Sequence, residues 1–203
     1  MEAQVIPFPS GFRELRPPRI AVGSGIVPEA APPRQGNPMV VVALELRRLV
    51  HAGMPLSYGA EAALRKRCVS AGLKALSVES SEVRLAGADE WLVMEATFEG
   101  VGATAAAAAA VLETDLAVRG IGGGEFVIAG AAASGRVERV GSTATMHGAP
   151  LALLAELWPK AAPGQVLLGG EEWAAERRIE VLPARGVELA SRLAPVFVLR
   201  GTS

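Results

Sequence analysis

Residues 39–46 of this 203-residue chain, MVVVALEL, form an apolar run rich in β-branched side chains. The run begins directly after Pro38 and is almost continuously apolar. Such a run is typical of a strand that is buried on both of its faces. We therefore expect residues 39–46 to form a central strand of a sheet, with the rest of the fold arranged around it.

The stretch before this strand has a different composition. Residues 1–38 contain eight of the 14 prolines and show neither helical nor strand periodicity. This predicts a tail or linker that is partly extended, followed by one folded domain over residues 39–203. A solvated linker is the favoured interpretation, and the alternative is that Val5–Phe8 and Phe12, which are apolar, dock on another surface.

Four segments after residue 46 have the composition of helices. Ser57 can cap a helix that runs to about Leu76, and its apolar positions recur every three to four residues. These positions are Leu64, Cys68, Ala71 and Ala75. The other predicted helices cover residues 102–118, which include the alanine run 105–110, then 145–157 and 170–177. The alanines should allow close approach to a sheet.

The remaining segments indicate strands. Residues 77–85 and 91–98 alternate in polarity around the turn-forming stretch 86–90, which predicts a hairpin. Further strands are expected over 125–133, continued or folded back over 135–140, and over 165–168, 179–182, 187–190 and 196–200. Taken in order, these elements predict an α+β sandwich with helices packed on one sheet.

Residues 120–124, GIGGG, have the letters of a phosphate-binding loop. A phosphate loop follows a strand and opens a helix, so that its backbone amides point at the anion. Here the order is reversed, because the loop follows a predicted helix and precedes a predicted strand. We therefore expect a structural connection.

The composition excludes several classes of protein. Twenty Lys and Arg against 21 Asp and Glu give a net charge of −1, which argues against a nucleic-acid partner. No apolar stretch is long enough for a membrane span, and the first residues do not have the pattern of a signal peptide. The single cysteine, Cys68, cannot form an internal disulfide, which fits a cytoplasmic protein.

Several strings in the C-terminal third resemble those of one family. Residues 162–168, APGQVLL, resemble a "KPGQILIS" turn and strand, and residues 181–199 resemble a closing pattern that ends in "PVEVYEL". Upstream, residues 41–47 resemble "VLFADIRGF", and residues 85–91 resemble the hairpin "KxIGDEV". In order and spacing these strings resemble a class III nucleotide cyclase homology domain over residues 39–200. The resemblance implies a ferredoxin-like palm with a central, mostly antiparallel sheet.

The resemblance implies a role for two carboxylates. Cyclases of this family use such a pair to hold two divalent ions, which neutralise the triphosphate and activate a ribose hydroxyl. Glu45 and Asp89 stand at the matching positions. The alternatives are a charge at the end of a strand for Glu45 and an ordinary turn residue for Asp89.

The other functional positions of the family carry different residues. Its helix signature, approximately "GDxVNxAARL", aligns with residues 148–157, GAPLALLAEL. Ala149 stands in place of the purine-contacting Asp, Ala152 in place of the ribose-orienting Asn, and Glu156 in place of the Arg that stabilises the transition state. An anion at position 156 would oppose a triphosphate. Base recognition in the family uses a Lys near the second strand, but Lys66 and Lys74 fall on the predicted helix that runs from Ser57 to about Leu76.

These observations favour a degenerate cyclase domain without catalysis or cofactor, which acts as a dimerisation or protein-interaction module in bacterial signalling. Its partner would be a second copy or another protein, through a surface that includes Trp91 and the strand segment 125–137. Trp91 could instead fill the core.

The alternative is an active purine nucleotidyl cyclase that uses Mg²⁺ or Mn²⁺ at Glu45 and Asp89. A diguanylate cyclase ranks lower, although residues 87–91, GADEW, echo its "GGDEF" string, because the stretch after the first strand lacks "DxDxFKxxND". A third hypothesis is a sensor that binds a nucleotide without turnover.

Overall fold

The computed structural model describes residues 37–49, 56–87, 92–139, 146–147, 149–176, 181–184 and 195–199. The chain divides into two units, Met1–Pro33 and Arg34–Ser203, and all described residues belong to the second. Of the expected tail, residues 1–36 lie outside the described residues. Its last two residues belong to the first strand, which begins at Asn37.

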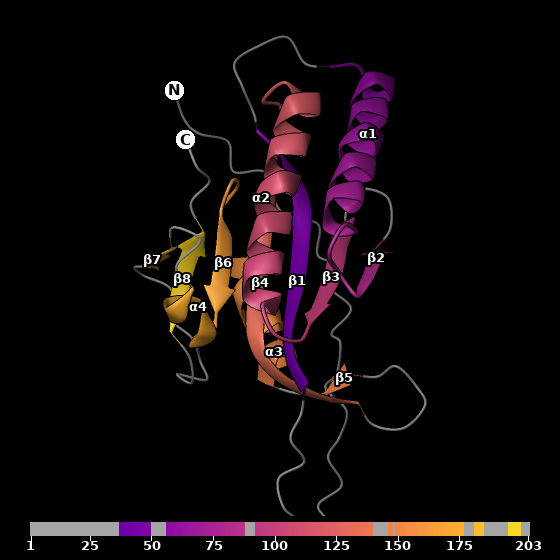
Figure 1. The fold of residues 1–203 in the computed structure, drawn as a ribbon. Helices are drawn as coiled ribbons and strands as arrows, with labels where there is room; N and C mark the ends of the chain where they lie inside the picture. The colour runs from indigo at the N-terminus through magenta and orange to yellow at the C-terminus, as the bar shows by residue number, and fades with distance from the viewer. Residues whose placement is uncertain are drawn as a thin grey trace, which may run out of the picture. The chain divides into compact units, whose positions relative to one another are not determined.

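The described strands form one sheet (Figure 1). Its path runs β2-β3-β1-β4-β6-β8-β7, with β5 paired to β4 off this path. Every neighbouring pair is antiparallel except β4 with β6, which is parallel, so the expected mostly antiparallel sheet is confirmed. The strands are β1 (Asn37–Arg48), β2 (Glu82–Ala86), β3 (Val93–Glu99), β4 (Phe126–Arg139), β5 (Met146–His147), β6 (Val166–Gly169), β7 (Val181–Pro183) and β8 (Val196–Leu199).

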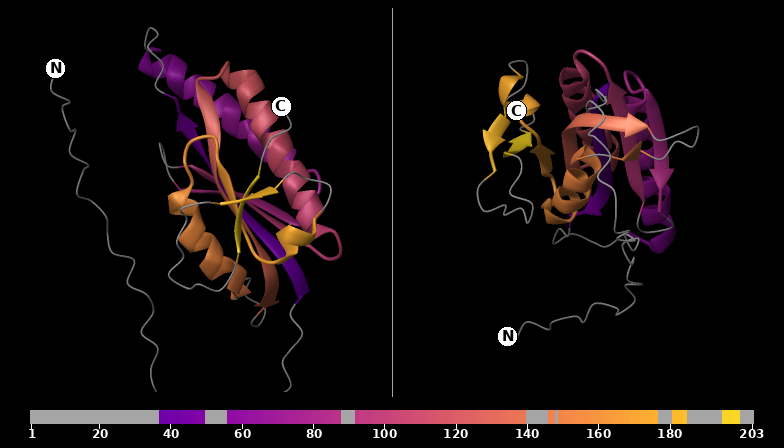
Figure 2. Two further views of the ribbon diagram at one scale, coloured as in Figure 1. Left: turned by 90° about the vertical axis from the view of Figure 1, so that its left-hand side faces the viewer. Right: turned by 90° about the horizontal axis from the view of Figure 1, so that it is seen from below.

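The helices lie on both faces of the sheet (Figure 2). The long helices α1 (Tyr58–Leu76) and α2 (Ala103–Gly122) cover one face, and α3 (Ala149–Leu157) covers the other. A 3-10 turn (Trp158–Lys160) continues α3, and a short helix α4 (Glu172–Ala175) follows β6. The architecture is therefore the expected α+β sandwich on one sheet.

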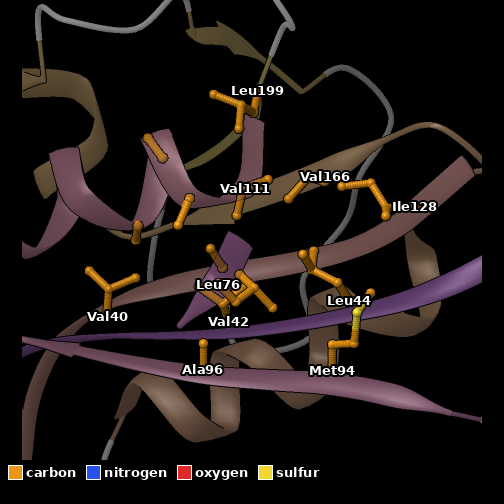
Figure 3. Close-up of a cluster of buried hydrophobic side chains, with 14 of the residues drawn as sticks. Val40, Val42, Leu44, Leu76, Met94, Ala96, Val111, Ile128, Val166 and Leu199 are labelled. Carbon is orange, nitrogen blue, oxygen red and sulfur yellow. The ribbon is translucent and has the colours of Figure 1, made fainter. Parts of the chain in front are cut away.

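Strand β1 is the centre of the fold. It pairs with β4 over its whole length and with β3 over Met39–Glu45. Val40, Val42 and Leu44 point into the core beneath α1 and α2 (Figure 3), whereas Met39 and Val41 belong to the core beneath α3. The prediction of a central strand buried on both faces is confirmed.

Helix α1 begins where expected but buries a different stripe. The Ser57 hydroxyl accepts a hydrogen bond from the Ala60 N–H at 3.3 Å. The buried residues are Cys68, Val69, Gly72 and Leu76, so only Cys68 of the predicted apolar face is fully buried. The reason is close packing at Gly72, where an added Cβ would lie 2.6 Å from Met94 Sδ and 3.3 Å from Thr114 Cγ2.

Helix α2 continues four residues beyond the predicted end at residue 118. Gly123 then adopts φ 58°, a left-handed conformation that favours glycine, and its N–H bonds to the Arg119 carbonyl. The glycine-rich stretch 120–124 thus ends a helix ahead of β4, which confirms the structural connection. Ala107 and Ala108 are fully buried, as the alanine run predicts.

The other element boundaries differ locally from the predictions. Residues 77–79 form a turn after α1, so β2 begins at Glu82. Strand β4 is continuous through Arg139, which excludes a hairpin over 135–140. Residues 146–147 form β5 and the following helix starts at Ala149, because this segment first pairs with the end of β4. The strand predicted over 187–190 lies outside the described residues.

Candidate functional site

Glu45 lies near the middle of the sheet. In β1 it stands between Val93 of β3 and Ala129 of β4, and only 9% of its surface is exposed. Side chains alternate along a strand, so Glu45 shares the α3 face with Met39 and Val41. A carboxylate this buried requires a partner.

That partner is Arg47, two residues further on and on the same face. Its Nε forms a short ion pair with Glu45 Oε1, and its Nη1 donates a 2.8 Å hydrogen bond to the Ala161 carbonyl. Ala161 lies between the 3-10 turn after α3 and strand β6. The Glu45 carboxylate is therefore neutralised by a guanidinium that the chain itself fixes in place.

The ion pair bears on the metal-binding role that the resemblance implies for Glu45. A guanidinium occupies Glu45 Oε1, and it would repel a divalent ion at the same oxygen. No group of three or more His, Cys, Asp or Glu side chains that could hold a metal ion occurs in the described part of the chain. Asp89, the second expected ligand, lies outside that part.

The three positions of the helix signature lie on α3. Ala149 begins the helix, Ala152 is exposed, and Glu156 is half-buried with an oxygen 3.7 Å from Lys160 Nζ. The ion pair with Lys160 joins residues one helical turn apart. Glu156 is thus an anion that a neighbouring cation already accompanies.

Close packing fixes α3 on the sheet. Leu153 and Leu157 are buried against Gly169 of β6, where an added Cβ would lie 2.6 Å from both side chains. Helix α3 therefore lies on the same face of the sheet as Glu45. The structure brings the predicted helix signature and the first carboxylate to one side of the sheet, and Asp89 and Trp91 remain outside the described residues.

Sequence reasoning missed a second polar cluster at the end of β6. The buried Ser134 hydroxyl donates a 2.7 Å hydrogen bond to Glu172 Oε2, and Trp173 Nε1 donates to the Gly169 carbonyl at 3.1 Å. Ser134 and Glu172 are 38 residues apart, so no local pattern links them. The contacts connect α4 to β4 and β6, and Trp173 is completely buried, which makes the cluster structural.

The expectation that segment 125–137 contributes to a dimer surface is corrected for most of its length. Residues 126–134 are buried within the chain, because helices α2 and α3 cover both faces of β4. Exposure begins only near Arg136.

Among the described helices, none has the length and apolar character that a membrane crossing needs.

Comparisons with known proteins agree with this architecture. No protein-family model and no curated protein matches the chain. Among solved structures, the adenylyl cyclase CyaB from P. aeruginosa is similar at 15% identity and a TM-score of 0.61, over 83% of this chain and 96% of that one. The catalytic core of a rhodopsin-guanylyl cyclase with converted specificity follows at 12% and 0.58, over 83% and 98%.

The guanylyl cyclase Cya2 gives 14% identity and a TM-score of 0.54, over 83% of this chain and 95% of that one. At such low sequence identities, structural similarity indicates a shared fold and does not indicate a shared activity. Each of the three structures is similar to this chain over 83% of its length. The chain therefore has the fold of a class III adenylyl and guanylyl cyclase homology domain.

Proposed function

We propose that this chain is a catalytically inactive cyclase-like domain that acts as a dimerisation or protein-interaction module in bacterial signalling. The observation that carries the proposal is the ion pair of Glu45 with Arg47, anchored on the Ala161 carbonyl. The residue expected to hold a divalent ion is engaged in a structural contact. The single buried cysteine, Cys68, fits the cytoplasmic location that we propose.

The residues of α3 support the same conclusion. A methyl group at Ala152 offers no hydrogen bond to a ribose, and the carboxylate of Glu156 adds negative charge where phosphoryl transfer calls for a cation. A triphosphate beside Glu156 would meet a carboxylate that Lys160 accompanies, in place of the guanidinium that the resemblance implies. Loss of one transition-state donor typically costs about 10²–10³ in rate, and here the cation at position 156 is replaced by an anion.

Turnover is the direct test. The full chain is incubated with ATP or GTP and Mn²⁺, beside an established adenylyl cyclase as the positive control, and the products are resolved by mass spectrometry. We expect no cyclic nucleotide above a Glu45→Ala, Asp89→Ala double variant. Cyclic product that depends on these two residues would overturn the proposal and establish the active-cyclase alternative, and a cyclic dinucleotide from GTP would establish a diguanylate cyclase.

The interaction role has its own test. Light scattering on the purified chain gives its mass in solution, and affinity capture from its host recovers any other protein partner. Trp91 is the interface residue that we propose, so Trp91→Ala should weaken association and leave the fold stable. A large loss of stability would instead identify a core tryptophan, for which about 3–5 kcal/mol is typical. A strict monomer without any captured partner would overturn the interaction role.

A further inference from the structure

Strand β2 ends the sheet on the side of α1. Among the described residues it pairs with β3 and with no other strand. Glu82, Arg84 and Leu85 are exposed, and Leu85 keeps 44% of its surface accessible. An edge strand of this kind presents unpaired backbone groups that a further strand can take up.

The two faces of β2 differ in character. Val83 packs against the core beneath α1 and α2, whereas Glu82 and Arg84 lie on the opposite face. Arg84 forms an ion pair with Glu95 of the neighbouring β3, so its guanidinium is held over that face of the sheet. On this face β2 thus carries one anion, Glu82, and one cation, Arg84, two residues apart along the strand.

Such a strand can pair with a second copy of itself. A two-fold axis perpendicular to the sheet makes the two strands antiparallel and keeps equivalent faces on the same side. Residues that lie directly opposite each other must then be on the same face of the joined sheet. This holds only if the axis passes between one residue of β2 and the same residue of the other copy. Within β2 (Glu82–Ala86) the possible centres are Glu82, Val83, Arg84 and Leu85.

Charge distinguishes these four registers. An axis at Leu85 sets Arg84 opposite Ala86, so it gives the guanidinium no charged partner. An axis at Glu82 sets two carboxylates opposite each other, and an axis at Arg84 sets two guanidinium groups opposite each other, so both are disfavoured. An axis at Val83 sets Glu82 opposite Arg84 of the other copy, twice by symmetry. It also sets Val83 opposite its own equivalent, and Leu85 opposite Ser81.

We propose that two copies of this chain associate through β2 in the antiparallel register centred on Val83, which joins their sheets edge to edge. This names a second copy as partner and rests on the interaction role proposed above. Arg84 has enough donors to bond Glu95 in its own chain and Glu82 of the other copy together. The charges that disfavour the registers centred on Glu82 and Arg84 favour the one centred on Val83.

The test uses charge reversal at these exposed positions. Glu82→Arg sets like charges opposite each other in the homodimer, and so does Arg84→Glu. Each variant should raise the dissociation constant of the dimer about tenfold, which corresponds to about 1.4 kcal/mol. Sedimentation equilibrium over a concentration series measures the constant, and circular dichroism verifies that each variant is folded.

Mixing the two variants gives the decisive measurement. In a heterodimer of E82R with R84E, both pairs again consist of opposite charges. The equimolar mixture should therefore associate about as tightly as the unaltered chain, although each variant alone does not. Glu113→Arg is the matched control, because Glu113 is exposed on α2, away from β2, and the reversal changes the net charge equally.

Several results would overturn the edge pairing. These are a chain that stays monomeric at every concentration, a dimer that neither single reversal weakens, a mixture that fails to associate, and an E113R variant that is weakened as much as E82R. A dimer that is insensitive to both reversals would refute this interface and leave the interaction role intact. Cyclic nucleotide production would refute the inactive-domain role and leave the edge pairing intact.

Discussion

Replacing Arg47 tests whether Glu45 is a structural residue. In the folded chain Arg47 binds both Glu45 and the Ala161 carbonyl, so Arg47→Ala removes two charge-assisted interactions and leaves a carboxylate that is 12% exposed without its cation. Glu45→Ala removes the anion alone. The double variant removes both, and the four proteins form a thermodynamic cycle that isolates the interaction between the two side chains.

The burial of the pair sets the expected magnitude. Exposed ion pairs contribute about 0–1 kcal/mol, whereas breaking a fully buried pair costs about 3–5 kcal/mol. The side chain of Arg47 is 32% exposed and that of Glu45 is 12% exposed, so the pair lies between these limits. We expect a coupling energy of about 1–2 kcal/mol and a loss of about 2–3 kcal/mol for Arg47→Ala, which also loses the bond to Ala161.

Urea unfolding followed by circular dichroism gives the four free energies of unfolding. The Asp115–Arg119 pair of α2 is the matched control, since it is also an Arg–carboxylate contact but lies on the helix surface, with Arg119 47% exposed. Its cycle should give about 0.3–0.5 kcal/mol. A coupling energy for Glu45 and Arg47 no larger than this control would refute the assignment of Glu45 to a structural ion pair.

Three further predictions concern stability. Gly130→Ala should lower the free energy of unfolding by about 3 kcal/mol or more, because the new Cβ would overlap the carbonyl oxygen of Ala43 in β1. Gly120→Ala in α2 should raise it by about 0.4–1 kcal/mol, because a Cβ there meets nothing within 4 Å. Equal melting temperatures of the two variants would contradict this. Burial raises the pKa of the Cys68 thiol above its ordinary value of 9.0, against a smaller lowering by Arg67. The unfolded thiol therefore ionises first, and stability should fall as pH rises above about 9; a decline of equal slope in Cys68→Ala would exclude this cause. Deleting residues 1–36, whose prolines disfavour regular backbone pairing, should leave the urea midpoint nearly unchanged, and a large drop would show that they contribute to the fold.

The sequence predicted the elements whose signals are local. The apolar run of β1 indicated a buried strand, and Ser57 marked the start of α1. The buried stripe of α1 was predicted only in part, because Gly72 is buried for its small size and not for its hydropathy. Helix α2 continues past its predicted end to Gly122, where an added Cβ would lie 3.3 Å from Phe126 Cβ and 3.5 Å from Cys68 Sγ, so the small size of glycine suits this position.

The site was predictable in its positions but not in its contacts. Glu45 was identified from its place in β1, and the structure puts it on the same face of the sheet as α3. Glu45 and Arg47 are two residues apart on one strand, so strand alternation predicts that they share a face, whereas the bond from Arg47 to the Ala161 carbonyl joins residues 114 positions apart. No spacing rule connects residues so distant, so the anchoring of Arg47 on Ala161 could not be foreseen.

The register of β1 with β4 also determines when the domain can form during synthesis. Its paired residues are 78 positions apart at Arg48 and Phe126, and 100 apart at Asn37 and Val137. At about 5–20 residues per second, a ribosome needs roughly 5–20 s after β1 to complete its partner strand. For that interval one of the most apolar segments of the nascent chain lacks its longest pairing, so protection of the emerging β1 by a chaperone should raise the yield of folded protein.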